Sequence, residues 1–130
     1  MGTPTAREAP PQPRAASVSA VIPCLDEEAA IAAVVTAVLA HGVNEVVVVD
    51  GGSRDRTAER ARGAGARVVI ELRRGYGLAI QSGIEAVRPD SDILLFLDGD
   101  GSDRPEMIPD VIGPVVAGQV AFVHGTRLGG

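Results

Sequence analysis

Hydrophobic residues along this chain alternate between short continuous runs and the spacing of a helix. Continuous apolar runs are typical of strands that are buried on both faces of a parallel sheet. Such runs predict strands at 18–22, 43–49, 68–70, 92–97 and 120–123. Between the first two runs, Ile31, Val34 and Val38 repeat at the period of an amphipathic helix. Because strand and helix alternate in this way, the expected fold class is α/β, with a Rossmann-like, mostly parallel sheet flanked by helices.

Proline, glycine and acidic residues set the expected limits of these elements. Pro23 is expected to end the first strand, because proline lacks a backbone N–H. The acidic residues at 26–28 lie where a helix N-terminus favours negative charge, and Gly42 lies where that helix is expected to stop. Further helices are expected over 55–62, over 75–87 and, in short or kinked form, after Pro105.

Composition adds limits on partners and location. A length of 130 residues suits one ordinary domain, and 45% hydrophobic with 2% aromatic residues predicts an aliphatic core. The net charge of -5 argues against a nucleic-acid partner, which would favour a basic face. No segment reaches the ~20 apolar residues of a transmembrane helix. The single cysteine, Cys24, is expected to be a small buried apolar residue rather than a reactive thiol.

Residues 1–16 differ from the rest of the chain. They contain four prolines and two arginines but lack the apolar stretch of a secretory signal. We expect them to form a disordered leader, which leaves residues 17–130 as the folded domain.

Two acidic residues separated by one glycine, Asp98 and Asp100, directly follow the predicted strand at 92–97. Ligands of open α/β sheets bind just beyond the carboxyl ends of the strands. Two negative charges roughly 5 Å apart repel by about 3 kcal/mol at an effective dielectric constant of 20. A hard divalent cation such as Mg²⁺ or Mn²⁺ relieves that repulsion. The run therefore predicts a metal site, and a simple polar turn is the alternative.

Other polar and glycine-rich segments also follow predicted strands. Residues 23–27 follow the first strand, and residues 50–52 follow the second. Because the carboxyl ends of parallel strands open on one edge of a sheet, we expect these segments to form one site with residues 98–100. The amino ends of the strands are expected to be apolar, with Asp92 as the exception.

Segment 73–77 carries two arginines and two glycines before a predicted helix. Its backbone N–H groups and arginine side chains, together with Arg127 beyond the last predicted strand, are suited to hold a pyrophosphate. A solvated loop is the alternative for Arg73 and Arg74.

Three other ligand motifs can be compared with this pattern. A calcium loop that starts at Asp98 is excluded, because Asp103 stands where its glycine belongs and Pro109 where its glutamate belongs. A phosphate loop is excluded because it needs a lysine and this chain has none. An NAD-binding Rossmann site stays an alternative, since segment 75–77 follows a strand and opens a helix, although Ile80 occupies the third glycine position.

Four segments together resemble the inverting family-2 glycosyltransferases. They are the opening nucleotide-binding segment at 21–28, the segment at 45–57, the Asp-x-Asp at 98–100 and the segment at 122–127. They occur in the family's order and at about its spacing, and the resemblance covers residues 17–130. Segment 75–77 and the Pro-Glu pair at 105–106 look most like the dolichyl-phosphate mannose synthase branch and its bacterial polyprenyl-phosphate relatives.

The resemblance implies a GT-A fold, whose Rossmann-like half binds a nucleotide sugar, with Mg²⁺ or Mn²⁺ as the cofactor. It implies catalytic roles for Asp98, Asp100 and Arg127. It implies metal binding by Asp98, Asp100 and Ser102. It implies donor binding by Pro23, Leu25, Glu27, Asp50, Gly51, Arg74 and Gly75.

The implied reaction moves a sugar, with inversion, from a GDP- or UDP-linked donor to an acceptor. In the narrower branch that acceptor is a lipid phosphate at a membrane surface. The expected location is therefore the cytoplasm, with peripheral contact to the inner face of the membrane and no transmembrane segment in this chain.

Some positions depart from the family pattern. Leu25 stands where many relatives carry an aromatic ring, Asp26 where they carry asparagine, and Gly99 where alanine is common. Relatives also continue for about another half-domain, so the domain is expected to be incomplete at its C-terminal end. The alternative function is accordingly a nucleotide-sugar-binding module without activity.

Overall fold

The computed structural model describes residues 16–101 and the backbone of residues 122–124. The strands are β1 (Val18–Cys24), β2 (Glu45–Asp50), β3 (Arg67–Ile70), β4 (Ile93–Phe96) and β5 (Phe122–His124). The helices are α1 (Ile31–Ala40), α2 (Thr57–Gly63) and α3 (Tyr76–Ala86). Most of the expected leader and the helix expected after Pro105 lie outside the described residues. No helix in the described part of the chain is long and apolar enough to cross a membrane.

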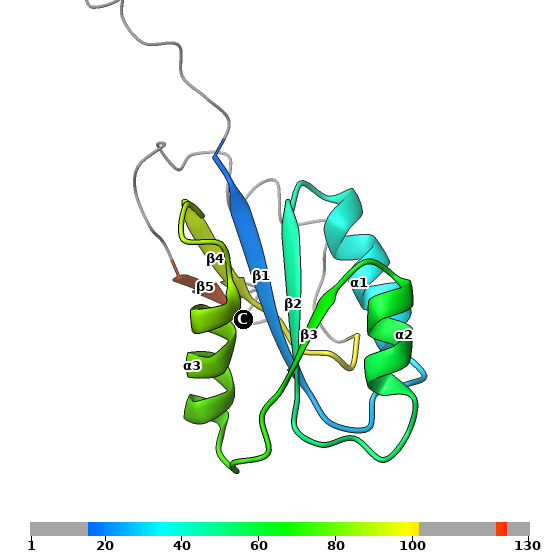
Figure 1. The fold of residues 1–130 in the computed structure, drawn as a ribbon. Coiled ribbons are helices and arrows are strands. Elements are labelled where there is room, and N and C mark those ends of the chain that lie inside the picture. The colour runs from blue at the N-terminus through cyan, green and yellow to red at the C-terminus, as the bar shows by residue number, and fades with distance from the viewer. Residues whose placement is uncertain (1–15, 102–121, 125–130) are drawn as a thin grey trace, which may run out of the picture.

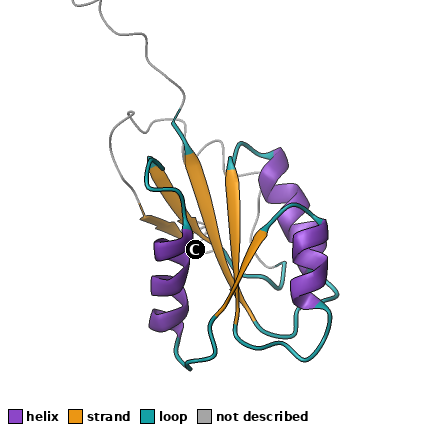
Figure 2. Ribbon diagram, in the orientation of Figure 1, coloured by secondary structure: helices purple, strands orange, loops and turns teal. Residues whose placement is uncertain are grey.

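All five strands are parallel, in the order β3-β2-β1-β4-β5 (Figure 1). Helix α3 covers one face of the sheet, and α1 and α2 cover the other (Figure 2). The expected α/β class with a parallel sheet is confirmed. The strand order runs outward in both directions from β1 and β4, so these two strands form the topological switch point at which such sheets bind ligands.

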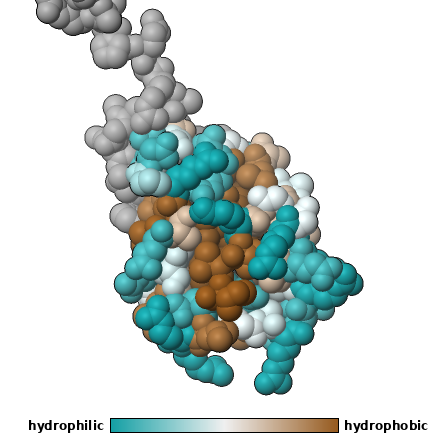
Figure 3. All heavy atoms as spheres, viewed as in Figure 1, coloured by the Kyte–Doolittle hydropathy of each residue, from teal (hydrophilic) through white to brown (hydrophobic). Residues whose placement is uncertain are grey.

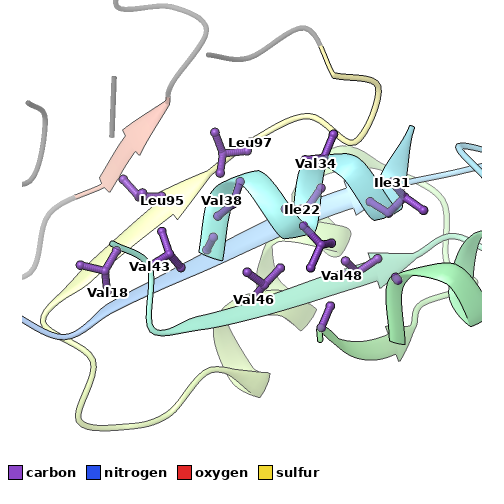
Figure 4. Packing of buried hydrophobic residues seen from close by; sticks show 14 of the residues in the cluster. Val18, Ile22, Ile31, Val34, Val38, Val43, Val46, Val48, Leu95 and Leu97 are labelled. Carbon is purple, nitrogen blue, oxygen red and sulfur yellow. The ribbon is translucent and has the colours of Figure 1, made fainter. Parts of the chain in front are cut away.

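Two apolar layers hold the helices to the sheet. Alternate side chains of each strand point to opposite faces, so Ile22 and Val48 lie with α1 whereas Val21 and Val47 lie with α3. Figure 4 shows the larger layer, in which Ile31 and Val38 of α1 pack over the strands. Strands β1, β2 and β4 are therefore buried on both faces, which explains their continuous apolar runs.

Helix α3 approaches β1 closely at Gly83. A Cβ added to this buried glycine would overlap Cγ1 of Val21 and lie 3.2 Å from Cγ2 of Val49. The small residue that the helix–strand contact requires is therefore Gly83, whereas Ile80 is partly buried in the layer beneath α3.

One expected boundary is wrong. Pro23 does not end β1 but pairs with Val49 of β2 inside the strand. The sheet tolerates this proline because β4 pairs with β1 only as far as Val21. No carbonyl of β4 therefore needs a backbone N–H from position 23. The acidic residues at 26–28 lie just before α1, and the carbonyl of Glu27 accepts the N–H groups of residues 30 and 31.

Candidate functional site

The carboxyl ends of the central strands open into one cleft of about 800 Å³, at the lower edge of the sheet in Figure 1. Most of the residues expected to bind the donor or metal line this cleft. They are Pro23, Leu25, Glu27, Gly51, Arg74, Gly75, Asp98 and Asp100. Segments far apart in the sequence therefore meet beside the switch point between β1 and β4.

Asp50 is placed differently from its neighbours. Its side chain is buried and does not line the cleft. Its Oδ1 accepts the N–H of Gly52 at 3.1 Å, the N–H of Ser53 at 2.8 Å and the Ser53 hydroxyl at 2.6 Å. In this arrangement Asp50 holds the turn after β2. Ser102 and Arg127 lie outside the described residues, and the roles expected for them stay predictions.

The two carboxylates after β4 are positioned by the glycine between them. Gly99 is buried, and a Cβ added there would lie 2.9 Å from Cβ of Cys24. There is therefore little space for the methyl group of an alanine at position 99. Asp98 is half-buried and Asp100 is exposed at the rim. Their oxygen ligands suit a hard cation such as Mg²⁺ or Mn²⁺, and residues 16–101 bring no group of three or more His, Cys, Asp or Glu side chains together as a ready metal site.

Asp26 joins the β1–α1 loop to the β2–α2 loop. Its φ of 53° is positive, a conformation that aspartate and asparagine tolerate better than most residues. Its N–H donates to Oγ of Ser53 at 2.8 Å, and its Oδ1 accepts the N–H of Arg54 at 2.9 Å. This reciprocal pair fixes the backbone on both sides of Asp26, where Leu25 and Glu27 face the cleft. It also explains why Asp can stand in place of the family's Asn.

A second set of hydrogen bonds joins the same two loops, closer to the start of α2. The N–H of Glu27 donates to Oγ1 of Thr57 at 2.8 Å, and the N–H of Glu28 donates to Oδ2 of Asp55 at 3.2 Å. The Thr57 hydroxyl donates to Oδ1 of Asp55, and this bond is the main reason why the pKa of Asp55 is lowered. The buried start of α2 therefore anchors the loop that carries Glu27.

Glu71 forms an anchor that the sequence did not reveal. Its carboxylate accepts the Arg73 N–H at 2.9 Å, the Arg73 Nη2 at 2.6 Å and the Ser82 hydroxyl at 2.5 Å, and its own N–H donates to the carbonyl of Asp50 at 2.9 Å. The bonds from Arg73, followed by that from Ser82, lower the pKa of Glu71 to about 2. Glu71 thus joins β2, α3 and the loop between β3 and α3. Arg74 is left without a side-chain partner among the described residues and lines the cleft.

Cys24 lies at the base of the cleft and packs partly against the larger apolar layer. Burial, with a further contribution from the charge of Asp50, raises the pKa of its thiol to about 12. The expectation of a small buried apolar residue rather than a reactive thiol agrees with this raised pKa, although Cys24 is only partly buried.

The position of segment 75–77 disfavours the dinucleotide alternative. This segment follows β3, which is an edge strand of the sheet. A dinucleotide fingerprint instead follows a strand at the switch point, which here lies between β1 and β4.

Comparisons with known sequences agree with the geometry of the cleft. The profile of the family described as Glycosyl transferase family 2 matches residues 19–130. A glucosyl-3-phosphoglycerate synthase of Mycolicibacterium paratuberculosis is 38% identical over 114 residues, which cover 78% of this chain and 34% of the relative. An uncharacterized glycosyltransferase of Mycobacterium tuberculosis is 38% identical over 99 residues, which cover 73% of this chain and 44% of the relative. The chain therefore spans less than half of the length of these relatives.

Solved structures give the same picture. The glucosyl-3-phosphoglycerate synthase of Mycobacterium tuberculosis in complex with Mn²⁺, UDP and glucosyl-3-phosphoglycerate is similar with a TM-score of 0.66 and 32% identity, covering 79% of this chain and 40% of that chain. The same enzyme has been solved with Mg²⁺ and UDP, at a TM-score of 0.66 and 32% identity, again covering 79% of this chain and 40% of that chain. These relatives support family 2 and the GT-A fold but not the narrower resemblance to dolichyl-phosphate mannose synthases.

Proposed function

Because this chain belongs to glycosyl transferase family 2, we propose that it binds a UDP-linked sugar with Mg²⁺ or Mn²⁺ and supplies the donor side of a sugar-transfer site. The observation that carries the proposal is the cleft at the switch point, which Asp98 and Asp100 line together with Gly51. The UDP and metal in the structures of the relatives support this choice of donor over a GDP-linked sugar.

Each part of the cleft suits one part of the donor. Pro23 and Leu25 offer apolar surface to the base, and Gly51 leaves room for the ribose to approach the backbone. Asp98 and Asp100 would hold the metal, which when bound neutralises the charge that develops on the leaving diphosphate. Arg74 offers a further positive charge to the same phosphates. Arg73 does not share this role, because Glu71 holds its guanidinium.

Two finer features of the reaction follow from the family resemblance. Inversion at the anomeric carbon is the expected stereochemical course, and NMR of the product's anomeric proton would test it. A lipid phosphate acceptor is not supported, because a related structure holds phosphoglyceric acid.

Calorimetric titration of the full chain tests the donor. UDP, GDP and NAD would each be titrated with and without Mn²⁺, and we expect UDP to bind most tightly and only with the metal. Binding of NAD without metal would contradict the proposal and restore the dinucleotide alternative.

A turnover assay then separates an enzyme from a binding module. The chain would be incubated with UDP-glucose and Mn²⁺, with and without phosphoglyceric acid, and UDP release would be measured. Release that depends on the acceptor supports transfer. Tight UDP binding with no release would support the binding module.

A further inference from the structure

Exposed apolar side chains gather around the candidate cleft. Of the large hydrophobic side chains that are exposed in the described part of the chain, Leu25, Leu72 and Tyr76 line the cleft. Leu72 is the most exposed of them at 71%, and Leu25 is 52% exposed. Figure 3 shows apolar side chains gathered between α3 and β3 on one face of the molecule, with polar side chains around them. A single exposed leucine needs no explanation, but several around one cleft point to a ligand that covers them.

The backbone on both sides of Leu72 is fixed. The N–H of Glu71 donates to the carbonyl of Asp50 at 2.9 Å, and the N–H of Arg73 donates to Oε2 of Glu71 at 2.9 Å. The Glu71 carboxylate is in turn held by Ser82 of α3. Leu72 is therefore presented on an ordered segment, so a ligand that covers it does not have to order the backbone first.

Leu72 and Leu25 lie against the same turn. A Cβ added to Gly52 would lie 2.9 Å from Cδ2 of Leu72, and a Cβ added to Gly51 would lie 3.8 Å from Cδ1 of Leu25. The two leucines, from different loops, thus border the glycine turn that follows β2. Leu25 alone would give a base little contact surface at this position, since it stands where many relatives carry a ring.

We propose that Leu72 is a donor-binding residue that forms, with Leu25, the apolar surface against which the nucleobase lies. This inference rests on the proposed function. The base is the part of a nucleoside diphosphate that gains from apolar contact, whereas its phosphates need the carboxylate-bound metal and Arg74. The two leucines therefore set the orientation of the donor, with the base at the leucines and the diphosphate toward Asp98 and Asp100.

Calorimetry with the full chain in Mn²⁺ tests this assignment on four proteins: wild type, Leu72→Ala, Leu72→Met and Ile84→Ala. UDP and inorganic pyrophosphate are the two probes, because pyrophosphate lacks the base. We expect Leu72→Ala to weaken UDP binding about fivefold, from the loss of part of a side chain's apolar contact, and to leave pyrophosphate binding unchanged. Leu72→Met keeps the apolar surface and should bind UDP like the wild type. Ile84 is exposed on α3 outside the cleft, so its alanine variant is the matched control.

Other outcomes are equally decisive. UDP binding by Leu72→Ala at wild-type affinity would overturn the inference while leaving the proposed function intact. Equal weakening of UDP and pyrophosphate, or an equal loss in Leu72→Met, would also overturn it, because the effect would then come from the loop rather than from apolar contact. A wild-type chain that fails to bind UDP would overturn the proposed function and this inference together.

Discussion

The two ends of the parallel sheet carry the same kinds of polar residue but differ in how many of them are bonded into the fold. At the carboxyl end, Glu27, Asp98 and Asp100 line an open cleft. At the amino end, Glu45 and Asp92 turn toward the protein and are bonded to neighbouring groups. Asp50 and Glu71 at the carboxyl end are also bonded to neighbouring groups, so what distinguishes this end is the open cleft that its other carboxylates line.

The amino end forms a network centred on Glu45. Its Oε1 accepts the Ser19 hydroxyl at 2.8 Å and the N–H of Arg88 at 3.0 Å, and its Oε2 lies 3.5 Å from Nη2 of Arg67. Oδ2 of Asp92 accepts the N–H of Ser17 at 2.8 Å. The expected apolar character of this end, with Asp92 as the exception, is therefore wrong.

The comparison teaches that acidity alone does not mark a site. Buried carboxylates at the amino end are matched by donors from β1 and from the segment after α3, which leaves little for a ligand to bind. At the carboxyl end, backbone N–H groups of the two loops bond to Asp26, Asp55 and Thr57, while Glu27, Asp98 and Asp100 line the cleft.

Asp100→Asn should produce the largest effect. It removes a charged oxygen ligand from the proposed metal site, so the Mn²⁺-dependent gain in UDP affinity should fall about 100-fold. Calorimetric titration of UDP with and without Mn²⁺ measures this gain. The control is Asp90→Asn, because Asp90 is exposed at the opposite end of the sheet. An unchanged metal dependence would remove Asp100 from the site.

Glu45→Ala should affect the fold and spare the site. It leaves the Ser19 hydroxyl and the Arg88 N–H without their acceptor, so the free energy of unfolding should fall by about 2 kcal/mol. Urea denaturation followed by circular dichroism measures the loss. UDP affinity of the folded fraction should stay within about twofold, and a larger drop would break the separation between the two ends.

Substitutions at Asp26 should separate backbone strain from the loop bond. Asp26→Asn keeps both the positive φ and the acceptor and should behave like the wild type. Asp26→Gly tolerates the positive φ but lacks the acceptor, and Asp26→Ala lacks the acceptor and is strained at a positive φ. The free energy of unfolding should therefore decrease from Asn to Gly to Ala, by about 1 kcal/mol for each step. UDP affinity should decrease in the same order, because Leu25 and Glu27 lose their fixed positions. Equal affinity in all three variants would show that this clamp does not position the site.

Glu71 should contribute a smaller, pH-dependent effect. Its pKa in the folded protein is about 2, below its ordinary value of 4.5, so its contribution is complete above pH 4.5 and is lost as the pH falls toward 2. The difference in Tm between wild type and Glu71→Gln should therefore be positive at pH 6 and shrink between pH 4.5 and 2. Glu85→Gln, an exposed change on α3, is the control. A difference that does not vary with pH would contradict the charge-dependent role of Glu71.

Much of the fold could be predicted from the pattern of apolar runs. Each predicted strand is present within two residues at either end. For β1, β2 and β4 the physical reason is that a strand buried on both faces needs continuous apolar residues. The position of Pro23 inside β1 was not predictable, since it depends on where β4 ends. The order of the strands was likewise beyond local pattern, because it is set by packing between distant segments.

The site could be predicted only in part, for a similar reason. Residues that directly follow a strand, such as Gly51, Asp98 and Asp100, could be placed at the cleft because parallel strands share their carboxyl edge. Glu71 and Leu72 were missed because their roles depend on contacts with α3 and with the turn after β2, which no short-range pattern encodes. Gly83 was missed because helical spacing alone does not show which turn of a helix touches a strand.

The packing of Cys24 against Gly99 provides a built-in reporter of cleft opening. With its thiol pKa at about 12, this single cysteine should resist maleimide at neutral pH as long as the native contacts last. Labelling should therefore be slow, and it should speed up when the ends of β1 and β4 separate. Its rate, followed by mass spectrometry, would report how often the cleft opens. Binding of a nucleotide in the cleft should slow the labelling, and no engineered probe is needed.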